Sequence, residues 1–328
     1  MAAYTTIDDP EAYFQVQLYT GNGSANHAIT LGGDTDMQPD LVWIKNRDAS
    51  DDHCIFDSVR GATKLLTGED GAETTDTDTL DSFTSDGFQV DADVKVNTNA
   101  EDYVSWNWKE SATSGLDIIG YTGDASAGTT AHNLSAVPKM IFVKEYSHAT
   151  NWAIYHVGTG NTNFLKLNTT AAVEDTDNWN DTDPTSSVFS LGGGGQTNNS
   201  GRTYIAYVFA DVQGFSKFGS YTGNGNADGP FVYTGFRPAW AMFKKTNGAA
   251  DWEIMDNKRA GYNDATYKLV ANETNIENTD TGRLEILSNG FKIRTTGTGL
   301  NTSGGTYIYA AFAEAPFVNS NGVPCNAR

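Results

Sequence analysis

Three lysines and three acidic residues recur along the chain and are the first candidates for chemistry. The cations are Lys45, Lys144 and Lys244, and the acids are Glu110, Asp211 and Glu314. A cation held beside a carboxylate could support proton transfer. Both sets stand at the ends of predicted strands, where exposed ion pairs are common and contribute little stability. We therefore expect rim salt bridges or solvated strand ends, and not a catalytic pair.

Histidines and cysteines do not form a nucleophilic or zinc-binding set. His53 fills a position that Trp152 and Trp252 fill elsewhere in the chain, which indicates packing. His53 and Cys54 are adjacent, but neighbouring residues of a strand point to opposite faces, and no second Cys/His pair supplies the remaining ligands. We expect Cys54 and Cys325 to be free thiols. The residues predict no catalytic site, no metal site and no cofactor.

Other polar segments do not match known ligand loops. The segment that begins at Asp175 fails as an EF-hand, because Trp179 occupies the third ligand position and Asn180 stands where glycine is needed. Calcium bridged by carboxylates of separate loops stays open. Carboxylate pairs for glycoside hydrolysis carry no signal, since an acidic β protein offers many such pairs. The glycines 192–195 lack a following Lys-Ser/Thr and indicate a flexible loop rather than a phosphate cradle.

The segment 175–184 is the candidate ligand site. Trp179 lies there among Asp177, Asn178, Asn180 and Asp181, and the other parts of the chain have no aligned tryptophan. An exposed aromatic ring beside amide and carboxylate groups can stack on a sugar and hydrogen-bond its hydroxyls. Alternatively, Trp179 folds back onto its own domain. These five residues are the predicted ligand-binding residues.

Several landmarks keep the same offsets in three successive parts of the chain. Each part has a Tyr-Thr-Gly triplet, a proline six residues before the recurring lysine, His or Trp eight residues after it, and an asparagine six residues before a tyrosine. The landmarks are Tyr19, Pro39, His53, Asn97 and Tyr103; Tyr121, Pro138, Trp152, Asn198 and Tyr204; and Tyr221, Pro238, Trp252, Asn301 and Tyr307. Such self-similarity predicts three copies of one structural unit of about a hundred residues.

The landmarks and the short polar connections near Gly115 and Phe215 set the predicted boundaries. We place an N-terminal arm at residues 1–13, β repeats at 14–115, 116–215 and 216–317, and a C-terminal tail at 318–328. The arm precedes the first landmark and could dock the protein onto a larger particle, whereas the tail is too polar for a core. Either end is a candidate anchor.

Each predicted repeat contains apolar or aromatic runs of strand length separated by turn residues. The expected strands are 41–45, 64–67, 87–90 and 103–108; 140–144, 164–167, 189–191 and 204–209; and 240–244, 267–270, 290–293 and 307–312. No segment longer than a turn or two has the apolar period of a helix. We expect an all-β protein made of three tandem antiparallel β-sandwich or jelly-roll-like repeats.

Composition excludes some classes of partner. The chain has 328 residues, with 21 Lys plus Arg against 41 Asp plus Glu and a net charge of −20. Such a field repels phosphate backbones and anionic membranes, so we expect no nucleic-acid partner. No apolar run approaches the ~18 residues of a membrane span, and residues 1–10 lack the features of a signal peptide. We expect synthesis in a cytoplasm without an export signal and no membrane insertion.

Three segments carry a resemblance to a known group of proteins. They resemble a repeat found in virion proteins of tailed bacteriophages, marine ones especially, and comprise residues 1–10, 221–238 and 307–314. The resemblance covers nearly the whole chain and implies a virion structural protein of the kind often grouped with tail fibres. It supplies no catalytic motif, so no functional residue is transferred. The implied partners are other virion proteins.

Two structural functions follow from this resemblance. The first is a tail fibre or adhesin that binds a glycan or protein of the host surface. The alternative is a capsid head decoration or head fibre that has no host ligand. A carbohydrate-active enzyme or a purely cytosolic protein is a third class, but we expect no enzyme. Because fibres are usually trimeric, we expect a homo-oligomer and favour a trimer.

Overall fold

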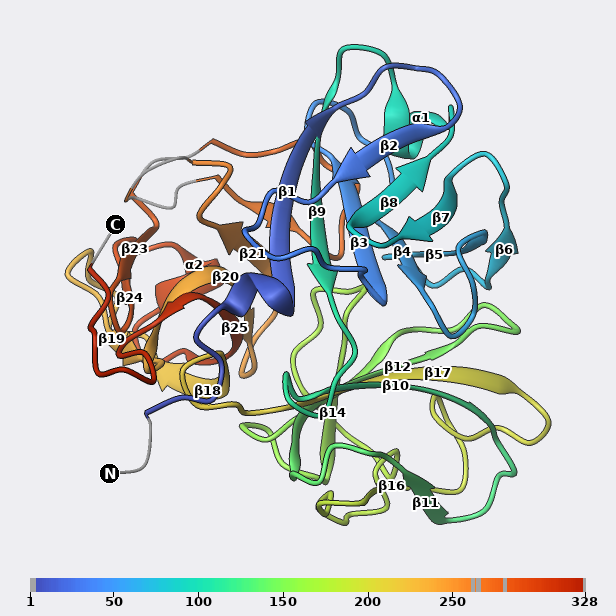
Figure 1. Ribbon diagram of the computed structural model, residues 1–328. Coiled ribbons are helices and arrows are strands. Elements are labelled where there is room, and N and C mark those ends of the chain that lie inside the picture. The colour runs from blue at the N-terminus through green and yellow to red at the C-terminus, as the bar shows by residue number, and fades with distance from the viewer. Residues whose placement is uncertain (1–3, 261–262, 264–266, 280–281, 327–328) are drawn as a thin grey trace.

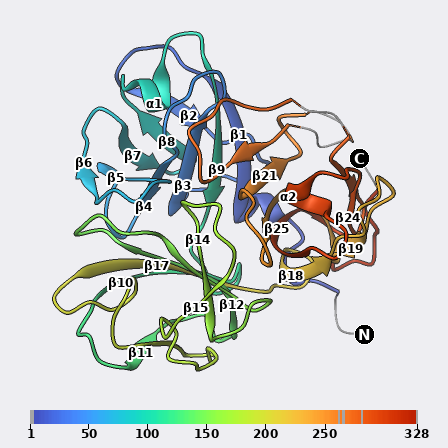
Figure 2. The same ribbon diagram turned by 180° about the vertical axis from the view of Figure 1, so that it is seen from behind.

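The structure is a computed structural model that describes residues 4–260, 263, 267–279 and 282–326. Strands hold 43% of the chain and helices 3%, so the predicted all-β class is confirmed. The short helices are η1 (Pro10–Ala12), α1 (Val94–Asn97) and α2 (Thr298–Asn301). All paired strands are antiparallel, and they form three lobes that meet at a common centre (Figures 1 and 2). We number the lobes in chain order.

Lobe 1 has a large sheet with the strand order β1-β9-β3-β4-β5-β6 and a small sheet with the order β2-β8-β7. The strands are β1 (Phe14–Thr20), β2 (His27–Thr30), β3 (Leu41–Asn46), β4 (Cys54–Asp57), β5 (Lys64–Thr67), β6 (Thr74–Thr75), β7 (Leu80–Thr84), β8 (Gly87–Val90) and β9 (Asp102–Trp108). The two sheets enclose an apolar core that includes Val42, Ile44, Phe56 and Phe88. Lobe 1 is therefore a β-sandwich.

Lobe 2 pairs a large sheet, β10-β17-β12-β13-β14-β15, with a small sheet, β11-β16. The strands are β10 (Leu116–Thr122), β11 (Gly128–Ala131), β12 (Pro138–Glu145), β13 (Ala153–His156), β14 (Asn163–Lys166), β15 (Glu174–Asp175), β16 (Val188–Leu191) and β17 (Thr203–Ala210). Its enclosed core includes Ile141, Val143 and Phe189. The large sheet has the same order of corresponding strands as in lobe 1.

Lobe 3 has the large sheet β18-β25-β20-β21-β22 and the small sheet β19-β24-β23. The strands are β18 (Ser216–Thr222), β19 (Phe231–Tyr233), β20 (Phe236–Lys245), β21 (Glu253–Asp256), β22 (Leu269–Val270), β23 (Leu284–Leu287), β24 (Gly290–Ile293) and β25 (Thr306–Pro316). Every strand segment expected from the sequence overlaps a strand of the structure. The segments 64–67, 87–90 and 290–293 agree with β5, β8 and β24 in their bounds.

The recurring asparagine and tyrosine close the same turn in each lobe. The side-chain oxygen of Asn97 accepts a hydrogen bond from the Asn22 N–H at 2.8 Å, and the oxygens of Asn198 and Asn301 accept in the same way from Asp124 and Asn224. The hydroxyls of Tyr103, Tyr204 and Tyr307 accept from the backbone N–H that follows each asparagine, at 2.8 Å. These contacts hold the strand that opens each lobe against the strand that closes it.

Those turns also explain the glycine of each Tyr-Thr-Gly triplet. A Cβ atom on Gly21 would lie 2.1 Å from the Thr98 carbonyl oxygen, which leaves no room for a side chain. The tyrosine of the triplet stacks on the closing tyrosine, and the ring centroids of Tyr19 and Tyr103 are 5.1 Å apart at an interplanar angle of 11°. Tyr121 and Tyr221 make matching stacks.

The large sheets are buried on both faces, because one face closes the sandwich and the other faces the centre of the molecule. In β3, Val42 and Ile44 belong to the sandwich core, whereas Leu41 and Trp43 belong to the central core. In β12, Ile141 and Val143 face the sandwich, and Phe142 faces the centre. The continuous apolar runs of the sequence follow from this double burial.

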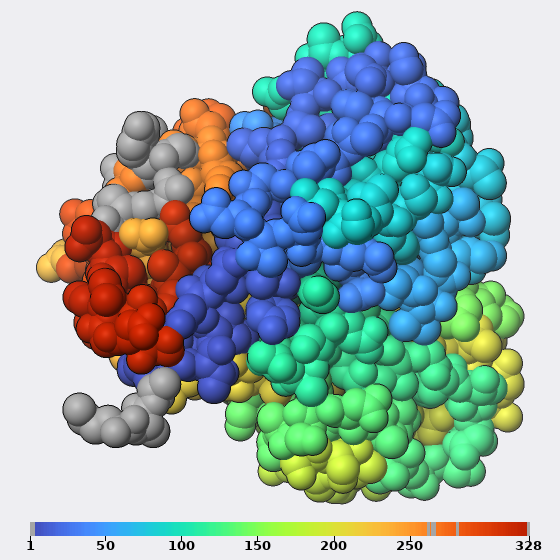
Figure 3. Space-filling model, in the orientation of Figure 1, coloured from blue at the N-terminus to red at the C-terminus, as the bar shows by residue number. Residues whose placement is uncertain are grey.

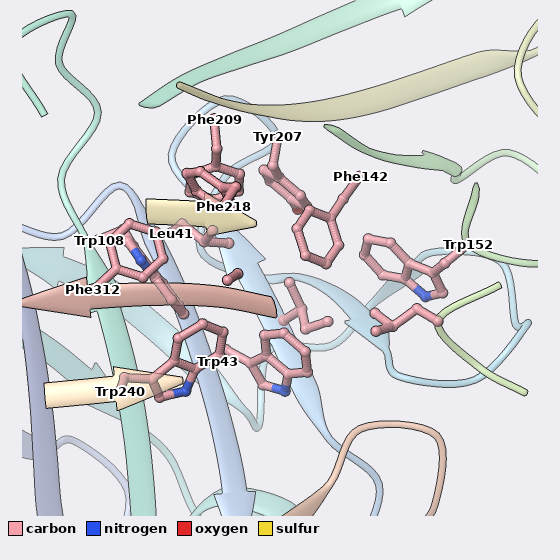
Figure 4. A pocket seen from close by; sticks show the side chains of 13 residues that line it. Leu41, Trp43, Trp108, Phe142, Trp152, Tyr207, Phe209, Phe218, Trp240 and Phe312 are labelled. Atoms are coloured by element: carbon pink, nitrogen blue, oxygen red, sulfur yellow. The ribbon is translucent and has the colours of Figure 1, made fainter. Parts of the chain in front are cut away.

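Aromatic side chains from the three lobes converge at the centre (Figure 4). Trp108 of lobe 1 lies 5.7 Å from Trp240 and 5.7 Å from Phe312 of lobe 3, measured between ring centroids. Phe209 of lobe 2 lies 5.8 Å from Phe312. The rings enclose a small apolar cavity of about 30 Å³. The three lobes therefore share one central core and are not independently packed domains.

The described part of the N-terminal arm, residues 4–13, is packed into the fold. Ile7 is buried in the central core, and the Thr5 hydroxyl donates to the Gln213 carbonyl at 2.8 Å. Asp8 accepts hydrogen bonds from Ser320, so both ends of the chain lie beside lobe 3 (Figures 1 and 3). The tail is exposed through most of residues 318–326, in agreement with its polar sequence. Residues 1–3 and 327–328 lie outside the described residues.

Candidate functional site

The recurring lysines are buried, so the prediction of rim salt bridges or solvated ends is wrong for the lysines. Lys45, Lys144 and Lys244 are each 0% exposed. The ammonium group of Lys144 donates to the carbonyls of Thr150 at 2.7 Å, Glu145 at 3.0 Å and Asp70 at 3.2 Å. Burial lowers the pKa of all three lysines to about 8. Their function in the fold is to satisfy backbone carbonyls of loops.

In lobes 2 and 3, one of the carbonyls that the buried lysine contacts belongs to the preceding lobe. Lys144 of lobe 2 reaches Asp70 in the loop after β5 of lobe 1, and Lys244 of lobe 3 reaches Thr169 in the loop after β14 of lobe 2, at 3.3 Å. Lys45 instead donates within its own lobe, to Asn46 and Ala49. A buried carbonyl without a donor costs free energy, so Lys144 and Lys244 stabilise the contacts between lobes.

The His or Trp eight residues after each lysine makes the next contact between lobes. The Trp152 indole N–H donates to the Thr67 carbonyl of lobe 1 at 3.0 Å, and that of Trp252 donates to the Lys166 carbonyl of lobe 2 at 2.8 Å. His53 Nε2 lies 3.0 Å from the Val270 carbonyl of lobe 3. The contacts thus run from lobe 2 to 1, from 3 to 2 and from 1 to 3, which closes the ring.

A second ring of contacts joins the last residue of β4, β13 or β21 to a neighbouring lobe. The Tyr207 hydroxyl donates to Asp57 at 2.8 Å, and the Trp106 indole N–H donates to Asp256 at 3.1 Å. At the corresponding position of lobe 2, His156 Nε2 lies 3.1 Å from the Tyr309 carbonyl. Asp57 and Asp256 also pair with the buried Arg60 and Arg259, each at 2.6 Å.

The recurring acids do not meet the recurring lysines, because they lie at opposite ends of the large sheets. β3 runs antiparallel to β9, so that Lys45 pairs with Val104 near the start of β9, whereas Glu110 follows its end. Asp211 instead pairs with Lys217, and Glu314 pairs with Arg237 at 2.9 Å. The recurring lysine and the recurring acid therefore do not form a pair with each other in any lobe.

Glu110 differs from the other two acids because its neighbours are acidic. Asp117 of lobe 2 stands where lobe 3 has Lys217, and Asp40 accepts a hydrogen bond from the Glu110 N–H at 2.8 Å. The Glu110 carboxylate accepts from the Ile118 N–H at 3.1 Å. Burial and the side chain of Asp117 raise the pKa of Glu110 to about 7.

The predicted ligand loop does not present an aromatic ring to solvent, which corrects the sequence-based assignment. Trp179 is 2% exposed and packs edge-on against Tyr155, with ring centroids 5.7 Å apart. Asn178 is also buried, and its carbonyl accepts from the Thr197 hydroxyl at 3.1 Å. Asp177, Asn180 and Asp181 are exposed. An aromatic ring between polar neighbours lacks the alternation that would have revealed its direction from the sequence.

Burial keeps His53 and His156 neutral. His53 Nδ1 accepts from the Trp43 indole N–H at 2.8 Å, which leaves the proton on Nε2 facing Val270. Burial lowers the pKa of His53 to about 3 and that of His156 to about 4. In the described part of the chain, no group of three or more His, Cys, Asp or Glu residues could hold a metal ion. The described residues also contain no helix long and apolar enough to cross a membrane.

The strongest candidate for a binding surface is a groove on lobe 3 that the sequence analysis missed. It has a volume of about 480 Å³ and lies between the connection that enters β18 and the turn between β19 and β20. Its lining includes Tyr4, Asp211, Gln213, Lys217 and Tyr233. The N-terminal residue Tyr4 is 229 positions away from Tyr233, so only the tertiary structure brings the two together.

Comparison with known proteins gives a family but no activity. Residues 9–316 match a family described as a domain of unknown function, DUF7483. This match spans all three lobes. No curated protein matches the chain.

Replacing Lys144 by methionine is expected to lower the free energy of unfolding by about 1–3 kcal/mol, because three buried carbonyls lose a donor. Chemical denaturation measures this change. Lys139→Met is the matched control, since Lys139 lies in the same strand and is only partly buried. An unchanged or higher stability of the Lys144 variant would show that the ammonium group does not hold the two lobes together.

Replacing Trp179 by alanine is expected to cost about 3–5 kcal/mol of stability, the scale of removing a buried aromatic side chain. Trp179→Phe should cost less, because the indole N–H has no hydrogen-bond partner among the described residues and the ring contact with Tyr155 is kept. Thermal unfolding followed by circular dichroism tests both variants. A melting temperature that does not move in the alanine variant would place the ring outside the core.

Replacing Glu110 by glutamine is expected to stabilise the protein at pH 8. Above pH 7 the carboxylate is charged in the folded and unfolded states, and the folded state carries the cost of burial beside Asp117 and Asp40. As the pH falls from about 7, the folded state takes up a proton before the unfolded state, whose pKa is about 4.5, so this cost disappears. The gain of the variant should therefore shrink toward pH 5.

Glu314→Gln is the control for that titration. Glu314 pairs with Arg237, so its neutralisation should not stabilise the protein at pH 8. Melting temperatures of both variants and the parent protein between pH 5 and pH 8 provide the comparison. A constant difference between Glu110→Gln and the parent across this range would contradict the raised pKa of Glu110.

Proposed function

We propose that this chain, which belongs to the DUF7483 family, is a non-enzymatic structural protein of a tailed-bacteriophage virion and contributes to host-surface binding as a tail fibre or adhesin. The resemblance of residues 1–10, 221–238 and 307–314 to virion repeats supports the virion assignment. One structural observation supports the proposal that the protein is not an enzyme: its recurring polar residues form hydrogen bonds that hold the fold together. Backbone carbonyls of a neighbouring lobe accept hydrogen bonds from four of these residues, Lys144, Lys244, Trp152 and Trp252.

We also propose that the three lobes are tandem copies of one repeat. The large sheets share the order of their corresponding strands, and the recurring lysines occupy one register position. Lys45 pairs with Val104, Lys144 with Ile205 and Lys244 with Ile308, and each partner directly follows the closing tyrosine of its lobe. The stacked tyrosine pairs and the asparagine-closed turns also correspond. A shared origin explains why these contacts recur.

The closed arrangement of lobes suits a compact binding module rather than a fibre shaft. Contacts run around the ring through Trp152, Trp252 and His53, so each lobe touches both others. In a virion, such a module would sit at the end of a fibre and associate with other virion proteins. The homotrimer remains our proposed oligomer, because it is the common state of fibres.

A capsid decoration is the second candidate, and the ring of three similar lobes favours it. A molecule with approximate threefold symmetry presents three related faces, which fits a threefold position of a capsid. In that case the protein would need no host ligand. The location of the protein on the particle separates the two functions.

The test uses the whole purified chain and the phage that carries it. We expect antibody labelling to mark the tail, and we expect the chain to bind host cells and to slow phage adsorption by competition. Host polysaccharide incubated with the chain should keep its length, because the protein has no proposed nucleophile and base set. Labelling of the head without cell binding would favour the decoration, and released oligosaccharides would establish an enzyme.

A further inference from the structure

Two aromatic side chains on β19 face solvent at positions where the other lobes have small residues. Phe231 is 48% exposed and Tyr233 is 53% exposed, and both alternate with the buried Val232. The register Val232↔Phe291 corresponds to Thr130↔Phe189 in lobe 2 and to Ile29↔Phe88 in lobe 1. The flanking outward positions are therefore Thr129 and Ala131 in lobe 2, and Ala28 and Thr30 in lobe 1.

The exposed aromatic residues are not needed for the sandwich. The two other lobes build the same sheet without them, and exposed aromatic surface is unfavourable in water. Among the large hydrophobic side chains that are exposed in the described residues, Phe231 and Tyr233 are the aromatic ones. Lobe 3 therefore carries a feature that folding does not explain.

Tyr233 forms one wall of the groove on lobe 3, and polar groups form the other. Asp211 and Lys217 pair across the connection between lobes 2 and 3, and Gln213 is exposed beside them. The Asp211 carboxylate also accepts from the Phe218 N–H at 2.9 Å, which fixes its position. At about 480 Å³ the groove falls within the roughly 300–1,000 Å³ of small-molecule sites.

Tyr4 holds the Tyr233 ring in place. The Tyr4 hydroxyl donates to the Gly235 carbonyl at 2.9 Å, so the Tyr233 hydroxyl is the donor in the 3.0 Å contact between the two tyrosines. A Cβ atom at Gly235 would lie 2.9 Å from the Tyr4 oxygen, and Gly235 has φ of +87°, so both space and backbone conformation require glycine. A ring fixed before binding loses little entropy when a ligand stacks on it.

We infer that this groove binds a neutral saccharide, with a pyranose ring stacked on Tyr233 and its hydroxyls hydrogen-bonded to Asp211, Gln213 and Lys217. The inference rests on the proposed function and names the ligand class of that surface. An aromatic face supplies apolar contact with the C–H groups of a sugar, and the carboxylate, amide and ammonium groups supply both acceptors and donors. The net charge of −20 disfavours an acidic glycan.

The groove offers what a sugar needs and little of what a peptide segment needs. It contains one exposed ring and several polar side chains rather than a deep apolar pocket for side-chain anchors. β19 has one neighbour in its sheet, β24, but its range of three residues gives a short edge for an added strand. These features favour a hydroxyl-rich ligand.

The direct test titrates the whole chain with the methyl α-glycosides of glucose, galactose and mannose, and with glucuronate as an acidic probe, by saturation-transfer NMR. We expect at least one neutral glycoside to bind more tightly than glucuronate. Tyr233→Ala should weaken that binding roughly tenfold or more with an unchanged melting temperature. Tyr233→Phe should keep most of the affinity, because it keeps the ring face. Tyr4→Phe should give an intermediate loss.

Val137→Ala is the matched control, since Val137 is an exposed apolar residue of lobe 2 and lies away from the groove. It should leave binding unchanged. The inference is overturned if none of the neutral glycosides binds, or if Tyr233→Ala binds as well as the parent chain. It is also overturned if Tyr233→Phe loses as much affinity as Tyr233→Ala, because the ring face would then not carry the contact.

Cell binding separates this inference from the proposed function. Periodate treatment of host cells destroys sugars and should abolish binding of the parent chain, whereas protease treatment should not. Loss of binding after protease treatment alone would identify a protein receptor and overturn the saccharide site while leaving the adhesin function standing. A parent chain that binds no host cells but binds a glycoside at Tyr233 would contradict the adhesin and retain the site.

Discussion

The architecture depends on buried donors that satisfy the backbone carbonyls of a neighbouring lobe. Trp152 and Trp252 reach the carbonyls of Thr67 and Lys166, and His53 reaches that of Val270 across the junction of lobes 1 and 3. A carbonyl sealed at such an interface needs a partner, because leaving it unpaired costs about 1–3 kcal/mol. These hydrogen bonds therefore select one arrangement of lobes, in which the last lobe contacts the first.

The shared aromatic centre joins the three lobes by apolar contact. Trp108, Trp240, Phe209 and Phe312 come from all three lobes and contact one another. Apolar contact is not directional, so the aromatic cluster by itself would tolerate several rotations of the lobes. The hydrogen bonds around the cluster are directional and fix how the lobes are rotated relative to one another. The recurring Lys, Trp and His residues are polar or amphipathic because they must donate hydrogen bonds from buried positions.

Residues that differ between the lobes are then the ones available for binding a ligand. The corresponding outward residues are Ala28 and Thr30, Thr129 and Ala131, and Phe231 and Tyr233. A scaffold whose recurring residues are committed to packing can vary at such positions without losing the fold. The N-terminal segment adds Tyr4 to the same surface of lobe 3, so the groove combines this segment with residues 211–235 of the chain.

The sequence by itself determined the all-β class and the positions of the twelve expected strand segments, because turn residues and apolar runs are local signals. It did not place others, such as β1, β10 and β18, which open the three lobes. It also predicted the packing of His53, since Trp152 and Trp252 mark that position as a place for large side chains. It did not reveal that Lys45, Lys144 and Lys244 are buried, because a strand end is exposed or covered according to which loops of its own lobe or of a neighbouring lobe pack on it. The sequence also did not reveal that Trp179 turns inward against Tyr155 of its own lobe, or that Tyr4 meets Tyr233, 229 positions away. Contacts between residues far apart in the chain are set by how the sheets pack, and no local pattern of residues encodes that packing.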